Sequence, residues 1–294
     1  MKYHLSLLAL LAVIVGCSST SELTYVGDLK NEDFVQPRLI PFNQRTDYYQ
    51  SGRSKYFPLL IEETVDRLDS GERSDIEKGT DQIGKITIAC YDKNFSAGFA
   101  LSDKLFRNYK DHPAYWNAIG TCYLLKNDFR KAQLYYNKSL DSMKDYAPAF
   151  NNLGVIYRKK NEQQKAFVAF ERAASLSRFS YTPKFNMAQM YLDHGLISQA
   201  LELLTTLNKI APNDVDVIAS LGTAYLFDGK YRAALSEYNK LPGSVTSRPE
   251  VGLNYALAHF LKGDKSKARD VFGEVKNNNS SLNGYYDELK RVLR

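Results

Sequence analysis

The residues from Pro113 to Leu282 repeat with a fixed period of 34 positions, without a single insertion or deletion. Alanine marks the period most clearly and returns as Ala132, Ala166, Ala200, Ala234 and Ala268. Twelve positions before each alanine the chain has a small residue: Gly120, Gly154, Ala188, Gly222 and Ala256. An exact period of this length predicts a solenoid, in which one supersecondary unit stacks on copies of itself.

The pattern within one period predicts a pair of antiparallel helices. The small residues fall at positions 8 and 20 of the repeat, where we expect the two helix axes to cross closely. Bulky residues at positions 4, 7, 11 and 24 fill the remaining space, and in the first repeat these are Trp116, Ile119, Tyr123 and Tyr136. One pair cannot bury this apolar face alone, so neighbouring pairs must stack. Turns are expected at matching offsets, at Asn127–Asp128, Asn161–Glu162, Gly195, Gly229–Lys230 and Gly263–Asp264.

The combination of Trp116, Gly120, Tyr123 and Ala132, returning at this spacing, resembles the tetratricopeptide-repeat (TPR) family. The resemblance covers residues 113–282 as five repeats. It implies an all-α fold, a solenoid of helix-turn-helix repeats with a C-terminal capping helix. Because packing positions define this family, the resemblance implies a fold and leaves the function open.

The same register extends beyond both ends of the five repeats. Backward, it predicts a degenerate repeat from Gly79 to His112, within N-terminal helices assigned to residues 55–112. There Gly98 takes the alanine position, whereas Ile86 takes position 8, which is small in the five repeats. Forward, the register predicts a single capping helix over residues 283–294, which closes the core because terminal units have one face toward solvent.

Residues 1–16 have the pattern of a secretory signal peptide. The apolar core Leu5–Val15 is too short to span a bilayer as a permanent helix. The segment Ile14–Cys17 resembles a bacterial lipobox, which implies that Cys17 carries lipid, including palmitate, and becomes the first residue of the mature chain. The other interpretation is an ordinary signal peptide that is cleaved near Ser18.

The residue after Cys17 bears on which membrane would hold the lipid. In enteric bacteria an aspartate at this place keeps a lipoprotein in the inner membrane, and here the residue is Ser18. The resemblance therefore implies a protein anchored through its acyl chains to the outer membrane and facing the periplasm. Residues 17–54 are mostly polar with scattered glycine and proline, which predicts a tether with a mean span of about 30–35 Å.

Two cysteines lie in the first helices of adjacent predicted repeats, at Cys90 and Cys122. The oxidising periplasm and the stacking of these helices allow a disulfide between them. The alternative is a pair of buried thiols that behave as small hydrophobic side chains. The sequence leaves both open, and we favour the thiols.

The sequence contains no pattern typical of catalysis or cofactor binding. It has no HExxH, CxxC, GxSxG, GxGxxG or phosphate-binding glycine loop. The three histidines after the predicted signal, His112, His194 and His259, all fall at positions that the repeat explains. The net charge of +6 is spread along the chain and forms no basic run. We therefore expect no enzyme, no cofactor, no metal site and no nucleic-acid partner.

What remains is the surface of the first helices, which line the concave side of a TPR solenoid. The resemblance places partner contacts at repeat positions 2, 5, 9, 12 and 13. From these positions we select a partner-binding groove that consists of Asn117, Thr121, Asn151, Val155, Arg158, Lys159, Phe185, Gln189, Thr223 and Phe227. Towards the C-terminus the same positions are apolar, and Leu226, Leu257 and Phe260 either extend the groove or belong to the core. The carboxylate clamp of chaperone-binding members is not expected, since Asn117, Asn152, Thr182 and Asn186 stand in its places.

The expected function is that of a non-enzymatic, lipid-anchored scaffold that binds a segment of another envelope protein. The layout resembles lipoproteins of Tad-type pilus assembly (TadD-like) and the pilotins that help a secretin to assemble. This implies a secretin, pilus or secretion component as client. The alternative is an adaptor for peptidoglycan hydrolases or proteases, and a third class is a carbohydrate binder. Homodimer formation through the end helices stays open.

Overall fold

The computed structural model describes residue 78 and residues 82–176, 181–277 and 279–294. The predicted signal peptide, Cys17, the tether over residues 17–54 and the helices expected before residue 78 lie outside the described residues. Within the described part the chain is helical throughout and has no strand. The helices are α2 (Gln82–Tyr91), α3 (Phe95–Tyr109), α4 (Pro113–Leu125), α5 (Phe129–Ser142), α6 (Ala147–Lys159), α7 (Gln163–Leu176), α8 (Thr182–Asp193), α9 (Ile197–Ile210), α10 (Val215–Phe227), α11 (Tyr231–Tyr238), α12 (Gly243–Thr246), α13 (Pro249–Leu261), α14 (Lys265–Gly273) and α15 (Asn283–Leu293), with a 3-10 turn at Ser280–Leu282.

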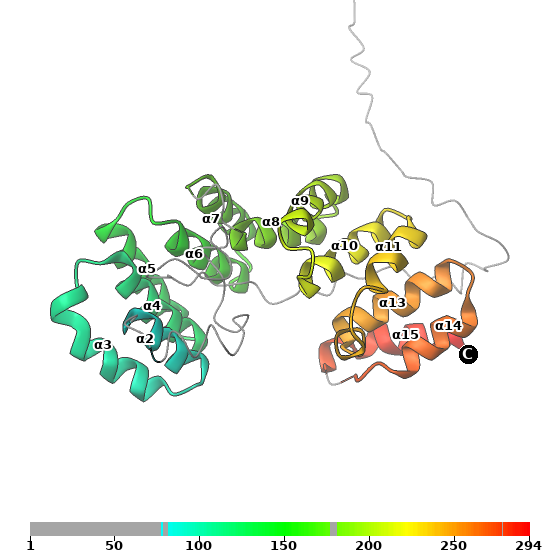
Figure 1. The fold of residues 1–294 in the computed structure, drawn as a ribbon, viewed down its shortest axis with the longest axis horizontal. Coiled ribbons are helices and arrows are strands. Elements are labelled where there is room, and N and C mark those ends of the chain that lie inside the picture. Colours follow the sequence, from blue (N-terminus) through cyan, green and yellow to red (C-terminus); the bar gives the residue numbers. More distant parts are fainter. Residues whose placement is uncertain (1–77, 79–81, 177–180, 278) are drawn as a thin grey trace, which may run out of the picture.

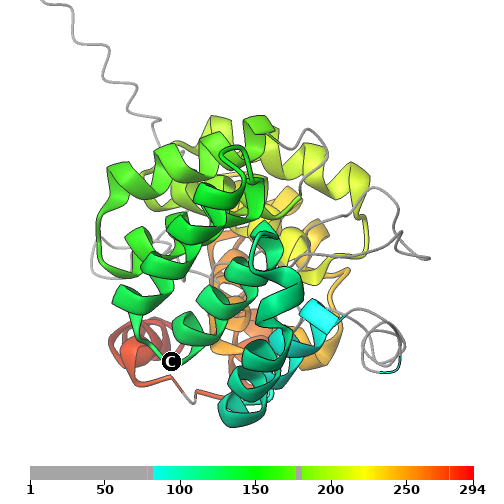
Figure 2. The same ribbon diagram turned by 90° about the vertical axis from the view of Figure 1, so that its left-hand side faces the viewer.

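The helices form consecutive antiparallel pairs that stack into an arch (Figure 1). The first helix of each pair, such as α4, α6 and α10, lies on the inner side, and the second, such as α5, α7 and α11, lies on the outer side. Viewed from the N-terminal end, α6 to α9 form the top of the arch and the C-terminal helices lie behind (Figure 2). The predicted all-α TPR solenoid is therefore confirmed.

The turn between the two helices of each pair is fixed by one residue in the left-handed region. These residues recur exactly every 34 positions, as Lys93, Asn127, Asn161, Gly195, Gly229 and Gly263, with φ between 60° and 95°. Glycine and asparagine adopt this conformation at the lowest energetic cost, which explains why they occupy the predicted turns. Lys93, at φ 61°, shows that the turn between α2 and α3 keeps the same register.

The glycines at position 8 lie directly beneath an aromatic ring of the paired helix. A Cβ added to Gly120 would lie 2.6 Å from the ring of Tyr136, and one added to Gly154 would lie 2.6 Å from the ring of Phe170. Gly222 stands in the same relation to Tyr238, at 2.7 Å. All three rings are fully buried. The third repeat has alanine at position 8, Ala188, and there the ring is replaced by the buried Leu204.

At the N-terminal end, Cys90 of α2 and Cys122 of α4 form a disulfide, with their Cα atoms 5.1 Å apart. The preference for two free thiols was therefore wrong. The disulfide also explains Gly98, because a Cβ at this alanine position would lie 2.6 Å from the Cys90 sulfur. The sulfur atoms thus take the space that an alanine methyl occupies in the other repeats. The cross-link ties the degenerate pair α2–α3 to the first full repeat.

At the C-terminal end the second helices become short. Helix α11 ends at Tyr238 and α14 at Gly273, and the backbone at Thr246 instead passes close to α13. A Cβ at Gly252 of α13 would lie 2.3 Å from the Thr246 carbonyl oxygen, so only glycine allows this approach. Helix α15 then closes the core with Tyr285, Leu289, Val292 and Leu293. Tyr285 is the fully buried tyrosine of this helix and donates a hydrogen bond to Asn254 Oδ1 (2.9 Å), and Tyr286 packs partly buried against the same core.

His259 of α13 stands where the four preceding repeats have tyrosine. It is 8% exposed, its two ring nitrogens have no hydrogen-bond partner in the described part of the chain, and its ring lies 5.0 Å from that of Tyr255. Burial lowers the pKa of His259 below the ordinary value of 6.5, as do Lys262 and Lys267, while Asp264 opposes the shift.

The glycine–ring contact predicts a compensating pair of substitutions. Gly154→Ala alone should reduce the free energy of unfolding by about 1–3 kcal/mol, because the methyl group collides with the Phe170 ring. The double variant Gly154→Ala with Phe170→Leu copies Ala188 and Leu204 of the third repeat, and its loss should be smaller than the sum of the single losses. Urea unfolding of all four proteins measures this coupling. Additive losses would show that the two side chains do not compete for space.

His259 predicts that part of the stability depends on pH. Its pKa is lower in the folded than in the unfolded state, so the unfolded state binds more protons as the pH falls below about 6.5. The free energy of unfolding should therefore decrease between pH 7.5 and pH 5.5. His259→Tyr, which restores the side chain of the other repeats, should flatten this dependence. Burial also lowers the pKa of His112, so His112 accounts for the pH dependence that remains in this variant. Identical slopes for the two proteins would contradict the assignment to His259.

Candidate binding face on the inner side of the arch

Asparagine side chains link three successive inner helices. Asn186 of α8 donates to Asn151 Oδ1 of α6 (2.8 Å), Asn151 donates to Asn152 Oδ1 (3.1 Å), and Asn152 donates to Asn117 Oδ1 of α4 (3.0 Å). All four residues are at most 2% exposed. Amides carry both donors and acceptors, so the chain of bonds can continue from repeat to repeat within a dry interior. These side chains therefore fix the spacing of the inner helices.

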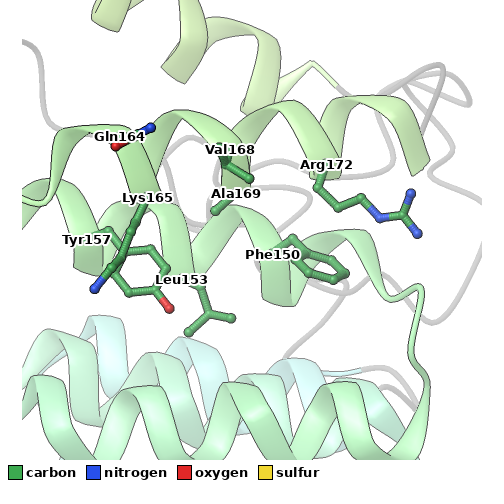
Figure 3. A pocket seen from close by; sticks show the side chains of 8 residues that line it. All are labelled: Phe150, Leu153, Tyr157, Gln164, Lys165, Val168, Ala169 and Arg172. Carbon is green, nitrogen blue, oxygen red and sulfur yellow. The ribbon is translucent and has the colours of Figure 1, made fainter.

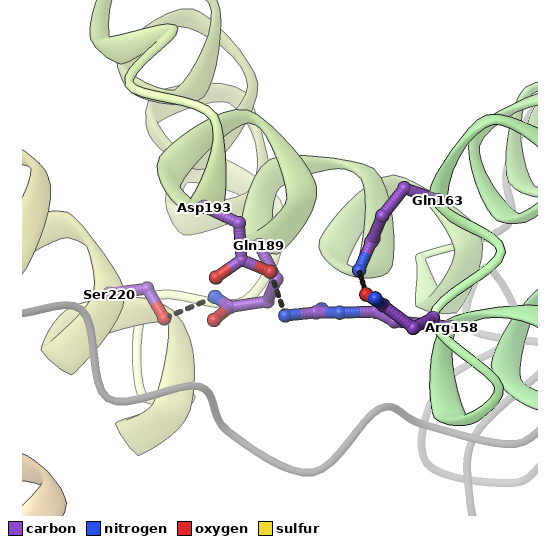
Figure 4. Close-up of polar contacts among 6 residues, drawn as sticks. Arg158, Gln163, Gln189, Asp193 and Ser220 are labelled. Atoms are coloured by element: carbon purple, nitrogen blue, oxygen red, sulfur yellow. Dashed lines mark hydrogen bonds and ion pairs between the residues drawn. The ribbon is translucent and has the colours of Figure 1, made fainter.

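An ion pair between Arg158 and Asp193 joins the C-terminal ends of α6 and α8 (Figure 4). The Arg158 side chain is 8% exposed and that of Asp193 is 24% exposed. Burial raises the pKa of Asp193, and Arg158 beside it acts in the opposite direction. Burial also lowers the pKa of Arg158, against the influence of Asp193. The two side chains thus form a partly buried ion pair beside solvent-exposed surface.

The Arg158–Asp193 pair belongs to a polar strip on the inner side of the arch, and Gln189 of α8 continues this strip towards α10. Its amide nitrogen donates to Ser220 Oγ at 2.8 Å, and Figure 4 shows it between Ser220 and the Arg158–Asp193 pair. Its carbonyl oxygen is buried without a hydrogen-bond partner in the described part of the chain. On the other side of Arg158, Gln163 donates to Asn161 Oδ1 (3.0 Å) in the turn before α7. The strip therefore crosses three repeats.

The structure divides the ten predicted groove residues into two groups. Seven are at most 4% exposed: Asn117, Thr121, Asn151, Val155, Phe185, Gln189 and Thr223. The two threonines face the second helix of their own repeat, because Thr121 Oγ1 lies 3.1 Å from Tyr136 Oη and Thr223 Oγ1 lies 2.9 Å from Tyr238 Oη. Of the other three, Lys159 is exposed, Phe227 is half-buried, and the Arg158 side chain, at 8% exposure, is largely buried in its ion pair with Asp193.

The apolar positions towards the C-terminus belong to the core. Leu226 and Phe260 are each 1% exposed and Leu257 is fully buried, and all three lie in the cluster that α10, α11, α13 and α15 share. Of the two interpretations that the sequence left open, burial in the core is therefore correct. Phe227, which is half-buried, presents an aromatic group at this end of the strip.

A second feature, which the sequence analysis missed, is a pocket between α6 and α7 (Figure 3). Its volume is about 510 Å³, and it is lined by Phe150, Leu153, Tyr157, Gln164, Lys165, Val168, Ala169 and Arg172. None of these belongs to the predicted groove. Figure 3 shows Lys165 near Tyr157 and Arg172 near Phe150, with Val168 and Ala169 between them. The signal in the sequence is an alanine at a position where the preceding repeat has a tyrosine.

Neither a metal centre nor a membrane-spanning helix emerges from the described residues. No three histidine, cysteine, aspartate or glutamate side chains in that part of the chain lie close enough to bind a metal ion together. None of the helices described there combines the length and the hydropathy that crossing a bilayer requires.

Comparison with known proteins supports the repeat assignment. The family model of the tetratricopeptide repeat matches residues 113–144 and 147–179, which form the pairs α4–α5 and α6–α7. A comparison with curated protein sequences gives no match.

Solved structures share the fold at low sequence identity. The chain is similar to the APC/C hetero-tetramer Cut9–Hcn1 (TM-score 0.61, 16% identity, 74% of this chain and 44% of that one). It therefore spans less than half of that relative. It is similar to PilF of Pseudomonas aeruginosa (TM-score 0.60, 15% identity, 72% of this chain and 96% of that one). It is also similar to PilW, described as a widely conserved type IV pilus biogenesis factor (TM-score 0.57, 15% identity, 72% and 97%). At these identities the likeness concerns the fold alone.

Three observations lead to the same result. They are the family match to two repeats, the left-handed turn residue that recurs in six helix pairs, and the similarity to three solved structures. The chain carries tetratricopeptide repeats and folds as a TPR solenoid.

Proposed function

We propose that this protein is a non-enzymatic scaffold that binds a segment of another envelope protein on the inner side of its arch. TPR domains bind peptide or protein partners, and the inner side of the arch offers such a surface. The observation that carries the proposal is the strip at the C-terminal ends of α6, α8 and α10. There Lys159 and Phe227 reach the surface beside the Arg158–Asp193 ion pair, on inner helices that buried hydrogen bonds hold in place.

The chemistry of the strip defines the kind of client segment. Lys159 presents positive charge at the end of α6, beside the largely buried Arg158, and Phe227 presents an aromatic ring at the same repeat position as Lys159 two repeats later. Asp193 already compensates part of the Arg158 charge, so Lys159 is the more available cation. A segment with an acidic or polar end and an apolar end complements this order.

We further propose that the client is a component of a pilus or a secretion system. The support is the similarity in fold to PilF and to PilW, which covers nearly the whole of both proteins. The proposed mechanism is physical: the solenoid holds a client segment while the tether keeps the solenoid beside a membrane. A secretin, a pilus subunit or another secretion component would be a client of this kind.

The proposed anchor is lipid on Cys17, which would place the protein at the outer membrane, facing the periplasm. Residues 14–17 support this proposal by their resemblance to a lipobox. Several acyl chains make release from a bilayer negligible, since each buried methylene contributes about 0.8 kcal/mol.

Lipidation predicts that Cys17→Ser abolishes incorporation of labelled palmitate and removes the mature protein from the membrane fraction. The matched control replaces both Cys90 and Cys122 by serine, and this variant should still take up label, since these two sulfur atoms form the disulfide. Metabolic labelling followed by membrane fractionation measures both effects. Palmitate in the Cys17→Ser protein would refute the proposed anchor.

The client site predicts a specific pattern of crosslinks in cells. A photo-reactive residue at Lys159 or Phe227 should capture a pilus or secretion component, whereas one at the exposed Glu202 of the outer helix α9 should not. Phe227→Ala should weaken binding of the captured client by about 1–2 kcal/mol, because aromatic anchors contribute much of the binding energy. Mass spectrometry identifies the captured protein, and titration with its purified segment measures the loss. Capture of peptidoglycan hydrolases or proteases would instead establish an adaptor for wall enzymes, and capture only from Glu202 would disprove the inner face as the site.

A further inference from the structure

The pocket between α6 and α7 exists because a small side chain stands where the preceding repeat has a ring. Ala169 is at position 23 of its repeat, and Tyr135 is at the same position one repeat earlier. The Tyr135 ring stacks on Trp116 and on Tyr123, with centroid distances of 5.9 Å and 5.2 Å. In the second repeat the flanking rings remain, as Phe150 and Tyr157, and Ala169 leaves the space between them open.

The charged groups around the two sites also correspond. In the second repeat Lys165 lies 5.8 Å from the centre of the Tyr157 ring, and Arg172 lies 6.0 Å from that of Phe150. The same two contacts occur in the first repeat, with Lys131 at 5.2 Å from Tyr123 and Lys138 at 4.3 Å from Trp116. The first repeat therefore shows which group fits between two such rings that each carry a cation. It is an aromatic side chain with a cation on each side.

We propose that this pocket binds an aromatic side chain of a partner protein, presented by a segment with acidic residues on both sides of the aromatic residue. The partner's ring would take the place that Tyr135 takes in the first repeat. Its carboxylates would contact Lys165 and Arg172, which lie seven residues apart on α7 and hence about 10 Å along the helix axis. The overall charge of +6 also favours an acidic partner.

Both cations are accessible to such a partner. The Lys165 side chain is 67% exposed and that of Arg172 is 49% exposed. Lys165 forms an ion pair with Glu162, and Arg172 forms one with Asp145, at 2.7 Å in both cases. Exposed ion pairs of this kind contribute only about 0–1 kcal/mol, so exchange for an incoming carboxylate costs little.

The apolar part of the pocket suits an aromatic anchor. Val168 on the rim is 57% exposed and adds apolar surface at the mouth of the pocket. The volume of about 510 Å³ lies within the range of ligand-binding pockets. Since the pocket shares no residue with the inner strip, this site is independent of the proposed function. The scaffold could then hold two partners at once.

The probe for the test is a fluorescein-labelled nine-residue peptide with a central tryptophan and two glutamates on each side. Fluorescence anisotropy with the purified full-length protein should show saturable binding. A peptide with alanine in place of tryptophan, and one with lysine in place of the glutamates, should each bind at least ten-fold more weakly. Equal binding of all three peptides, or no saturable binding of the first, would overturn the proposal.

The decisive variant is Ala169→Tyr, which fills the pocket with the side chain of the preceding repeat. Because Tyr135 is accommodated in an equivalent frame, this protein should fold, and circular dichroism checks that it does. Its affinity for the tryptophan peptide should fall at least ten-fold. The matched control is Leu203→Tyr, the same replacement at position 23 of the next repeat, and its affinity should be unchanged.

One further variant separates the contribution of charge from that of shape, and a measurement of oligomeric state tests another occupant. Lys165→Gln with Arg172→Thr introduces the residues of the next repeat, Gln199 and Thr206, and should weaken binding about ten-fold while leaving the fold intact. Unchanged affinity in this variant or in Ala169→Tyr would refute the site. If sedimentation showed a dimer that Ala169→Tyr dissociates, the occupant would be a second copy of this chain, and the acidic aromatic partner would be disproved.

Discussion

The contact between a small residue of the inner helix and a ring of the outer helix sets the geometry of every repeat in which it occurs. With glycine at position 8, a buried tyrosine or phenylalanine lies on the backbone itself, as at Gly120, Gly154 and Gly222. Alanine at position 8 adds a methyl group, and in the third repeat the opposing side chain shrinks to Leu204. The fifth repeat has Ala256 at position 8 and Phe272 at position 24, and there the ring is only partly buried. Close packing in the interior therefore couples the size and the burial of the two side chains. This contact therefore limits how closely the two helices of a repeat approach each other.

The two ends of the described stack are stabilised differently. At the N-terminal end the disulfide between Cys90 and Cys122 joins α2 to α4, and Gly98 makes room for it. A cross-link stabilises the folded state chiefly by restricting the unfolded chain, so it suits a degenerate repeat that packs less apolar surface. At the C-terminal end the amphipathic helix α15 covers the core and leaves Lys290 in solvent. Terminal units of solenoids need such a polar outer face.

The sequence predicted those parts of the structure that depend on the period. The helix pairs, the turns at Asn127 and Gly195, and the capping helix follow from residues that must be small, left-handed or apolar at fixed positions. It did not decide the disulfide, because the distance between Cys90 and Cys122 depends on how closely α2 approaches α4. The sequence assigned ten residues to a groove, but it did not predict how exposed each of them is. Seven of these are buried, and asparagines such as Asn151 use their amides to connect neighbouring helices. Exposure depends on the neighbours of a residue, and the period alone does not specify them.

The pocket between α6 and α7 illustrates a more general property of repeat folds. Packing positions tolerate little change, so differences between repeats collect at positions that the stack does not need, and position 23 is one of them. Tyr135 fills the space between two rings, and Ala169 leaves the same space empty without disturbing Gly154 or Phe170 beneath it. A binding site can therefore arise by the loss of one side chain, with its walls and its charges already in place. Comparison of one repeat with the next within a single chain identifies such sites, because each repeat serves as the reference for its neighbour.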